Sequence, residues 1–146
     1  MSHPKFYLFD TGVVRALSRR LREPLDAAER GALLETLVFH ELRAQIAYSG
    51  CGGELSYYRT PSGTEVDFVW RRGAFAVGIE VKASPRWRPE HGRGLAELHR
   101  AGVVTGCHGV YLGDIALQDG PIRVLPLRAF LGELSGGRVL AGARQR

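Results

Sequence analysis

The sequence predicts one mixed domain of the α/β or α+β class, in which helices pack against a single sheet. Three observations predict it: a length of 146 residues, one long helical pattern in the first third, and a two-residue periodicity after it. The chain is 45% hydrophobic and 24% charged, as folded domains commonly are. We therefore expect a folded domain with a sizeable core and not a disordered chain.

The apolar runs and the first residues indicate the cellular compartment of the protein. The longest apolar run, Ala74–Ile79, is far shorter than the roughly 18 residues that a membrane span needs. The opening residues lack the charged-then-apolar order of a signal peptide. We expect a cytoplasmic protein that does not enter a membrane.

Two helices are expected near the front of the chain. Asp10 or Thr11 can cap a short helix over residues 13–21. Asp26 can cap a longer helix over residues 27–48. The apolar residues of the longer helix recur at helical spacing: Leu33, Leu34, Leu37, Val38, Leu42 and Ile46.

Three consecutive strands should follow. Alternating patterns cover residues 55–59, 65–70 and 74–82, and tight turns at 61–63 and 71–73 separate them. Strands joined by such short turns form an antiparallel meander. After an Arg- and Pro-rich loop we expect further elements: a helix over 94–100, strands over 109–112 and 122–127, and a helical turn over 128–134. Residues 135–146 should form a flexible basic tail.

The charge balance points to a polyanionic partner. Twenty basic and fifteen acidic residues give a net charge of +5, which favours nucleic acid. All but two of the basic residues are arginine, so Lys5 and Lys82 indicate positions where a compact ammonium is preferred to a guanidinium. Neither lysine stands in the Gly-Lys-Ser/Thr context of a phosphate-binding loop, so the chain has no ATPase loop of its own.

Other chemistries find little support. Cys51 and Cys107 are the only cysteines, which disfavours a disulfide framework or a zinc site built on thiolates. No serine or cysteine lies in a nucleophile elbow or beside a histidine with an orienting acid. The sequence therefore gives no support to an enzyme that uses a serine or cysteine nucleophile.

Strand parity brings acids and a lysine together. In the third strand, Glu80 and Lys82 share the face opposite the apolar residues, and in the second strand Glu65 and Asp67 do the same. If the two strands pair, Asp67 and Glu80 converge. Two carboxylates suit Mg²⁺ or Mn²⁺ better than zinc, and the lysine can hold a phosphate oxygen or a water. Alternatively, these four residues form cross-strand ion pairs on a solvated face.

The long helix offers a third acid. Projected at helical spacing, Glu35 and Glu41 both fall in the apolar sector, and Thr36, His40 and Arg43 mark the solvated side. We favour Glu35 as the third acid, with Glu41 as the alternative. Either one can instead pair with a buried arginine.

Arginines and tryptophans alternate around the predicted acids. Arginine side chains with interleaved aromatic rings are typical of a nucleic-acid interface, although a solvated basic face has the same pattern. The candidate nucleic-acid-binding residues are Arg59, Arg71, Arg72, Arg86, Arg88 and Arg93, with Trp70 and Trp87 among them.

Five motifs together resemble a known family. They are Lys5–Gly12, Gly31–Glu35, Tyr57–Arg59, Gly63–Phe68 and Ile79–Lys82. They are similar to the C-terminal domain of unknown function of a family of prokaryotic AAA-type ATPases, which has a PD-(D/E)XK restriction-endonuclease-like core. The resemblance extends from Lys5 to about Leu134.

The resemblance implies a fold, a division of the chain and a site. The fold would be an α-β-β-β-α-β core over residues 26–134, with its meander extended by further strands. Residues 1–25, here called the leading segment, would link to an ATPase half that this chain lacks. Asp67, Glu80 and Glu35 would bind Mg²⁺ or Mn²⁺, and Lys82 would be the catalytic lysine.

Two functions follow from that resemblance. The first is metal-dependent hydrolysis of phosphodiester bonds in DNA. The alternative is a catalytically inactive module that binds nucleic acid or a protein partner for an ATPase.

Overall fold

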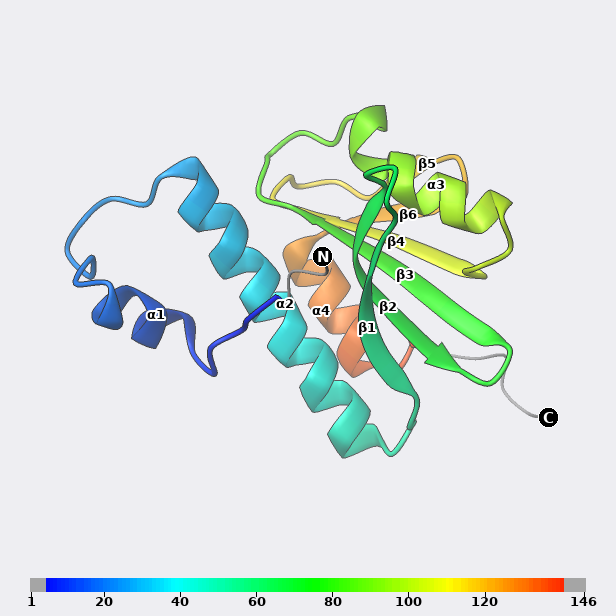
Figure 1. Ribbon diagram of the computed structural model, residues 1–146, viewed down its shortest axis with the longest axis horizontal. Coiled ribbons are helices and arrows are strands. Elements are labelled where there is room, and N and C mark those ends of the chain that lie inside the picture. Colours follow the sequence, from blue (N-terminus) through cyan, green and yellow to red (C-terminus); the bar gives the residue numbers. More distant parts are fainter. Residues whose placement is uncertain (1–4, 141–146) are drawn as a thin grey trace.

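A computed structural model describes residues 5–140 and consists of one open six-stranded sheet between helices (Figure 1). Helices α2 (Ala27–Ser49) and α4 (Leu127–Ser135) pack on one face of the sheet, and α3 (Arg93–Arg100) packs on the other. The expected class, a mixed domain of helices and one sheet, is confirmed. No helix within the described residues has the length and apolar character needed to cross a membrane.

The expected meander forms half of the sheet. Strands β1 (Glu54–Arg59), β2 (Glu65–Arg72) and β3 (Phe75–Lys82) pair antiparallel in chain order. Gly63 and Gly73, in the two turns, have φ of 92° and 59°, left-handed values that glycine adopts without strain. Local alternation and turn residues thus predicted this part of the fold correctly.

The other half of the sheet depends on contacts between distant segments. After α3, strand β4 (Gly106–Tyr111) pairs parallel with β3. Strand β6 (Ile122–Pro126) pairs parallel with β4, and the three-residue β5 (Leu117–Asp119) pairs antiparallel with β6 at the sheet edge. The sequence does not predict β5, because three residues are too few to reveal a periodicity.

The first helix is shorter than expected. Helix α1 (Thr11–Leu17) begins after Asp10, whose Oδ1 accepts the Val13 amide at 3.0 Å. The expected end at residue 21 is wrong, because Arg19 adopts a left-handed φ of 58° and breaks the helix.

The long helix follows its prediction closely. The side chain of Asp26 accepts the Glu29 amide at 2.7 Å at its beginning, and Gly50 ends it with a left-handed φ of 66°. Its expected solvated side is partly covered, because Thr36 is buried and His40 Nε2 contacts the Leu8 carbonyl. A helical projection cannot detect the cover on His40, since it comes from Leu8 of the leading segment.

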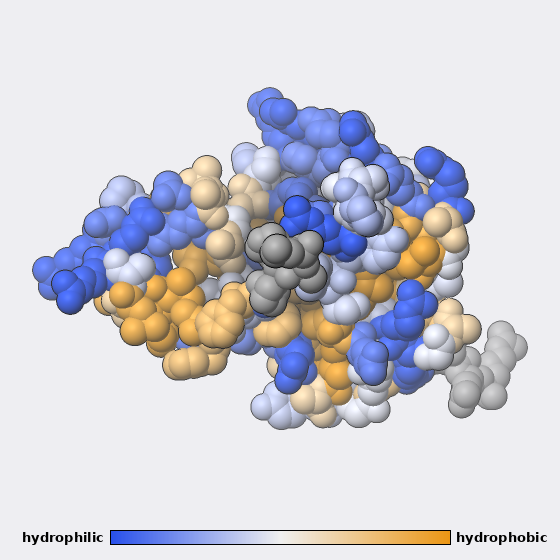
Figure 2. Space-filling model, viewed as in Figure 1, coloured by the Kyte–Doolittle hydropathy of each residue, from blue (hydrophilic) through white to orange (hydrophobic). Residues whose placement is uncertain are grey.

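Residues 5–25 of the leading segment contact α2 and expose apolar side chains. Figure 2 shows apolar surface gathered over α1, and the exposed residues in this region include Phe9, Leu17 and Leu21. Tyr7 points inward, because its ring stacks on that of Phe39 with centroids 4.3 Å apart.

The chain after α4 is packed as far as it is described. Val139 and Leu140 are buried against the same cluster as α2 and α4. The expectation of a flexible tail from Ser135 is therefore wrong for residues 135–140. Residues 141–146 of that expected tail and residues 1–4 of the leading segment lie outside the described residues.

Candidate functional site

Strands β2 and β3 separate at the point where two acids face each other. Their ladder of paired residues ends at Phe68 and Ile79, and the next opposed positions are Asp67 and Glu80. Here side chains replace the backbone pairing. The Val81 amide donates to Asp67 Oδ2 at 2.9 Å, and the Asp67 amide donates to Glu80 Oε2 at 3.4 Å. Both carboxylates are thus held between the strands by the backbone itself.

A β-bulge in β2 directs Asp67 into this position. Ser56 pairs with Val69 and Tyr58 with Val66, so β2 has one more residue than β1 in this interval. A bulge bends its strand and turns a side chain away from the regular alternation.

The bulge corrects the parity argument. Strict alternation predicted Val66 and Phe68 on one face, but Val66 packs with α3 and Phe68 packs with α2. Glu65 and Asp67 consequently have different environments. Glu65 is exposed and pairs with Arg59 at 3.0 Å, so a solvated cross-strand ion pair describes it correctly. Asp67 is enclosed.

Burial controls the electrostatics of the two enclosed acids. The Asp67 and Glu80 side chains are only 14% and 9% exposed. Burial, followed by the charge of Asp67, raises the pKa of Glu80 to about 7. Burial also raises the pKa of Asp67, although its bond from the Val81 amide opposes that shift. Because burial disfavours a charged carboxylate, each acid at neutral pH must either hold a proton or lie beside a cation.

Lys82 supplies a cation to Glu80. Its Nζ lies 2.6 Å from Glu80 Oε1, and both side chains lie opposite Ile79 and Val81, as alternation predicted. Burial acts to lower the pKa of Lys82, but the attraction of Glu80, Asp67 and Glu35 together outweighs it and the net shift is upward. Lys82 is therefore a charged ammonium beside the acids.

Lys5 supplies a second cation, which the sequence analysis did not place here. Its Nζ lies 2.8 Å from Glu35 Oε1 and 3.3 Å from Asp67 Oδ1. The Tyr7 hydroxyl donates to the same Glu35 oxygen. A signal was available, because the only two lysines of the chain both contact this group of acids.

Of the two helix acids, Glu35 lies near the enclosed acids and Glu41 does not. Glu35 reaches the group of acids through Lys5, whereas Glu41 is exposed beside Leu131 and Leu134. Glu35 is therefore the helix acid of this site, and its partner is a lysine and not the buried arginine considered as an alternative.

The three predicted ligands do not form a ready-made metal centre. Across residues 5–140, no three His, Cys, Asp or Glu side chains are arranged to hold a metal ion. Lys5 lies between Glu35 and Asp67. Asp67 and Glu80 nevertheless fit a hard divalent cation, because they are adjacent, enclosed carboxylates. Mg²⁺ commonly uses one or two protein carboxylates together with waters.

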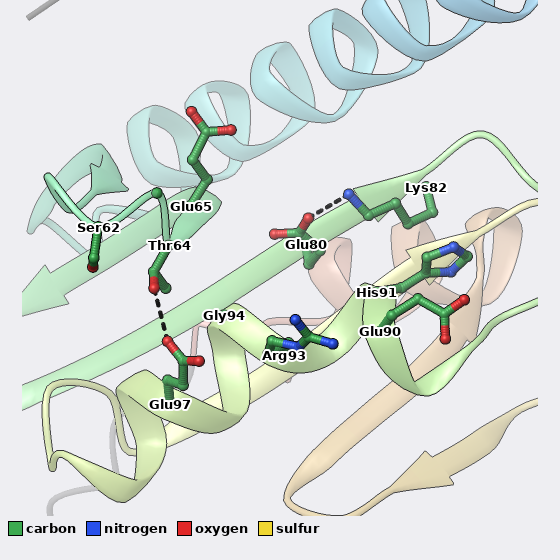
Figure 3. A pocket seen from close by; sticks show the side chains of 11 residues that line it. Ser62, Thr64, Glu65, Glu80, Lys82, Glu90, His91, Arg93, Gly94 and Glu97 are labelled. Atoms are coloured by element: carbon green, nitrogen blue, oxygen red, sulfur yellow. Dashed lines mark hydrogen bonds and ion pairs between the residues drawn. The ribbon is translucent and has the colours of Figure 1, made fainter.

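A cleft of about 460 Å³ opens beside Glu80 and Lys82 (Figure 3). Its other walls are the β1–β2 turn, α3 and the 3-10 helix η1 (Pro89–Gly92). Thr64 Oγ1 donates to Glu97 Oε2 at 2.8 Å between the turn and α3. A Cβ atom on Gly94 would lie 2.3 Å from the Glu65 carbonyl oxygen, so glycine permits the close approach of α3 to β2.

His91 projects from η1 into this cleft near Lys82 (Figure 3). Its Nδ1 accepts the Arg88 amide at 3.2 Å, and its ring meets Trp87 edge-on with centroids 5.5 Å apart. Burial, and then the charge of Lys82, lower the pKa of His91. The neutral ring therefore carries its proton on Nε2 and is held in one orientation.

The predicted arginines divide between two ends of the sheet. Arg93 lines the cleft, Arg59 pairs with Glu65 at its rim, and Arg86 and Arg88 lie in the adjoining loop. The expectation that all six lie near the acids is wrong for two of them, which stand at the far end of β2. Those two donate to main-chain carbonyls of Val103 and Cys51: Arg71 at 3.1 Å and Arg72 at 2.7 Å.

The tryptophans serve the fold. Trp70 is completely buried and donates to the Gly52 carbonyl at 2.9 Å, so its expected role in stacking on bases is wrong. Trp87 is half-buried and donates to Asp119 Oδ2 at 2.8 Å. Its ring also packs on Gly109, where a Cβ atom would collide with it.

Comparison with known families agrees with part of the resemblance. Residues 30–130 match the family described as Domain of unknown function (DUF4143), which is more than half of the chain. The chain belongs to this DUF4143 family. No curated protein and no solved structure matches it. The DUF4143 match includes Glu35, Asp67, Glu80 and Lys82, whereas Lys5 lies before it.

Proposed function

We propose that this chain is a metal-dependent phosphodiesterase domain that hydrolyses DNA and has a PD-(D/E)XK restriction-endonuclease-like core. The observation that carries the proposal is the opposition of Asp67 and Glu80 where β2 and β3 separate, with Lys82 Nζ 2.6 Å from Glu80. Two enclosed carboxylates beside each other are costly, and a bound divalent cation would offset that cost.

The topology supports the same proposal. The order α2, β1, β2, β3, α3, β4 is the α-β-β-β-α-β order expected of that core. The two acids come from the adjacent strands β2 and β3, and the helix acid Glu35 comes from α2. An active site at this position would be built on rigid elements.

Each site residue has a distinct part in the proposed chemistry. Asp67 and Glu80 would hold Mg²⁺ or Mn²⁺, with Glu35 as the third acid. When bound, the ion would supply positive charge for the phosphate and lower the pKa of a bound water. Lys82, oriented by Glu80, would donate to a phosphate oxygen or to the attacking water. His91 would present a neutral Nε2–H donor to the same cleft.

The surroundings suit a polyanion. Arg93 lines the cleft and Arg59 lies at its rim, with Arg86 and Arg88 in the adjoining loop. The net charge of +5 would further attract DNA. An upstream ATPase domain in a longer protein would be the natural source of movement along the strand.

A nuclease assay tests the proposal. Single- and double-stranded DNA would be incubated with Mg²⁺ or Mn²⁺ and the wild type, Asp67→Asn or Lys82→Met. We expect cleavage by the wild type and a loss of about 100-fold or more in each variant. Asp114→Asn, an exposed acid outside the cleft, is the matched control. Cleavage that survives both site substitutions would refute the mechanism.

One observation favours a second function. Lys5 and Lys82 already balance the buried acids without a metal ion, as an inactive nuclease-fold module would require. Such a module would bind nucleic acid, or a protein partner of an ATPase, and cut nothing. It predicts DNA binding that weakens with salt and is unaffected by a chelator, together with no cleavage under any metal condition.

A further inference from the structure

We propose that Lys5 is an internal counter-ion of the acid site, and that a divalent cation must displace it, which releases residues 5–9 from α2. The inference rests on the proposed function, since it concerns how the same acids exchange one cation for another. It assigns a regulatory part to a residue that lies before the family match.

Lys5 contacts the carboxylate oxygens that a divalent cation would need. Asp67 Oδ2 already accepts the Val81 amide at 2.9 Å, which leaves Oδ1 as the oxygen available to a cation. Lys5 Nζ lies 3.3 Å from that Oδ1 and 2.8 Å from Glu35 Oε1. The ammonium therefore joins the two acids that would otherwise be ligands.

An ammonium and a divalent cation cannot share these oxygens at low cost. Both are positive, and Asp67 is enclosed, so their repulsion is less screened than at an open surface. Lys82 Nζ forms an ion pair with Glu80 Oε1 at 2.6 Å. Of the two lysines, Lys5 is the one placed between acids that come from different elements.

Residues 5–9 are held to α2 by a few side-chain contacts, whereas α1 is held separately by the ion pair of Arg15 with Glu29 at 3.1 Å. Tyr7 stacks on Phe39 and donates to Glu35, and His40 contacts the Leu8 carbonyl. Within the described chain, residues 5–9 have no hydrogen bonds between backbone groups. Phe6 and Phe9 give little hold, because they are 85% and 76% exposed, and Leu8 is half-buried. Loss of the Lys5 ion pairs would therefore loosen the whole stretch.

Titration calorimetry tests the competition directly. Mn²⁺ would be titrated into the wild type and into Lys5→Met, both as the full chain, at one pH and low salt. We expect Lys5→Met to bind Mn²⁺ at least about tenfold more tightly, because one like charge has left the site. Arg22→Met removes an exposed charge from the same leading segment away from the acids, and its affinity should match the wild type.

Limited digestion with chymotrypsin provides a second readout that needs no Lys5 variant. In the wild type, Mn²⁺ should speed cleavage after Tyr7, because the Tyr7 ring must leave Phe39 before the protease can bind it. In Asp67→Asn, the same addition of Mn²⁺ should leave the cleavage rate unchanged. This measurement keeps the inference testable if Lys5→Met fails to fold.

The outcomes separate the inference from the proposed function. Equal Mn²⁺ affinity in the wild type and Lys5→Met, or weaker binding by the variant, would overturn the inference and leave the nuclease proposal standing. Binding by Lys5→Met alone would support the inference. Absence of Mn²⁺ binding in both proteins, with and without DNA, would overturn both.

Discussion

Asp67 and Glu80 occupy the first opposed positions beyond the β2–β3 ladder, and the Asp67 amide donates to Glu80 Oε2 at 3.4 Å. The Val81 amide donates in turn to Asp67 Oδ2. At these two positions, carboxylate oxygens accept the amide hydrogen bonds that main-chain carbonyl oxygens accept within the ladder. This explains how two acids tolerate enclosure, because each has a backbone donor and a lysine nearby.

Replacing Asp67 tests that backbone bond. Asp67→Ala leaves the enclosed Val81 amide without its acceptor, and we expect a loss of about 1–3 kcal/mol in the free energy of unfolding. Asp67→Asn keeps an acceptor oxygen and should lose less. Urea unfolding of both variants measures the difference, and Asp114→Ala at an exposed position should stay within about 0.5 kcal/mol of the wild type. Equal losses in the alanine and asparagine variants would contradict this account.

The raised pKa of Glu80 predicts a pH dependence of stability in the absence of divalent cations. Its pKa is about 7 in the folded protein and 4.5 in the unfolded chain. Between these pH values the folded state holds a proton that the unfolded state has lost. The stabilisation is therefore complete below about pH 4.5 and is lost as the pH rises through 7.

A glutamine at position 80 should remove that dependence. We expect Glu80→Gln to flatten the change in unfolding free energy between pH 5 and pH 8 by on the order of 2–3 kcal/mol. Urea unfolding at several pH values measures it, and Glu54→Gln, at the exposed beginning of β1, serves as the control. A Glu80→Gln profile parallel to that of the wild type would show that Glu80 titrates normally.

The contact of α3 with β2 predicts opposite effects for two glycine substitutions. Gly94→Ala places a Cβ 2.3 Å from the Glu65 carbonyl oxygen, so α3 must move and we expect a loss of about 1–3 kcal/mol. Gly31→Ala, within α2, meets nothing within 4 Å and should gain about 0.5–1 kcal/mol. Thermal unfolding compares the two. A neutral Gly94→Ala would mean that this cleft wall is adjustable.

The division of the arginines predicts which of them bind DNA. Arg93 lines the cleft, so Arg93→Ala should weaken DNA binding and reduce the salt slope by about 1. Arg72 donates to the Cys51 carbonyl at the far end of β2, and Arg72→Ala should leave that slope unchanged. Fluorescence anisotropy at several salt concentrations decides it, and equal effects would indicate a diffuse basic surface.

Local chemistry predicted most of the elements. The capping carboxylate of Asp26, the apolar spacing of α2, and the turn glycines Gly63 and Gly73 act within a few residues. Such signals can be read directly from a sequence. The same alternation correctly placed Glu80 and Lys82 on one face.

The site itself required the tertiary structure. The β-bulge at Asp67 becomes visible only when β2 is paired with β1, and it separates the environments of Glu65 and Asp67. No spacing rule relates Lys5 to Glu35 and Asp67, which lie 30 and 62 residues farther along the chain.

The sequence alone therefore determined the helices, the meander, and the presence of acids and a lysine in its strands, because backbone propensity and side-chain alternation are local. Tertiary packing decided which carboxylates are enclosed, which acid of α2 joins them, and that Lys5 is their second cation. Burial and charge pairing depend on neighbours that the fold brings together from distant parts of the chain.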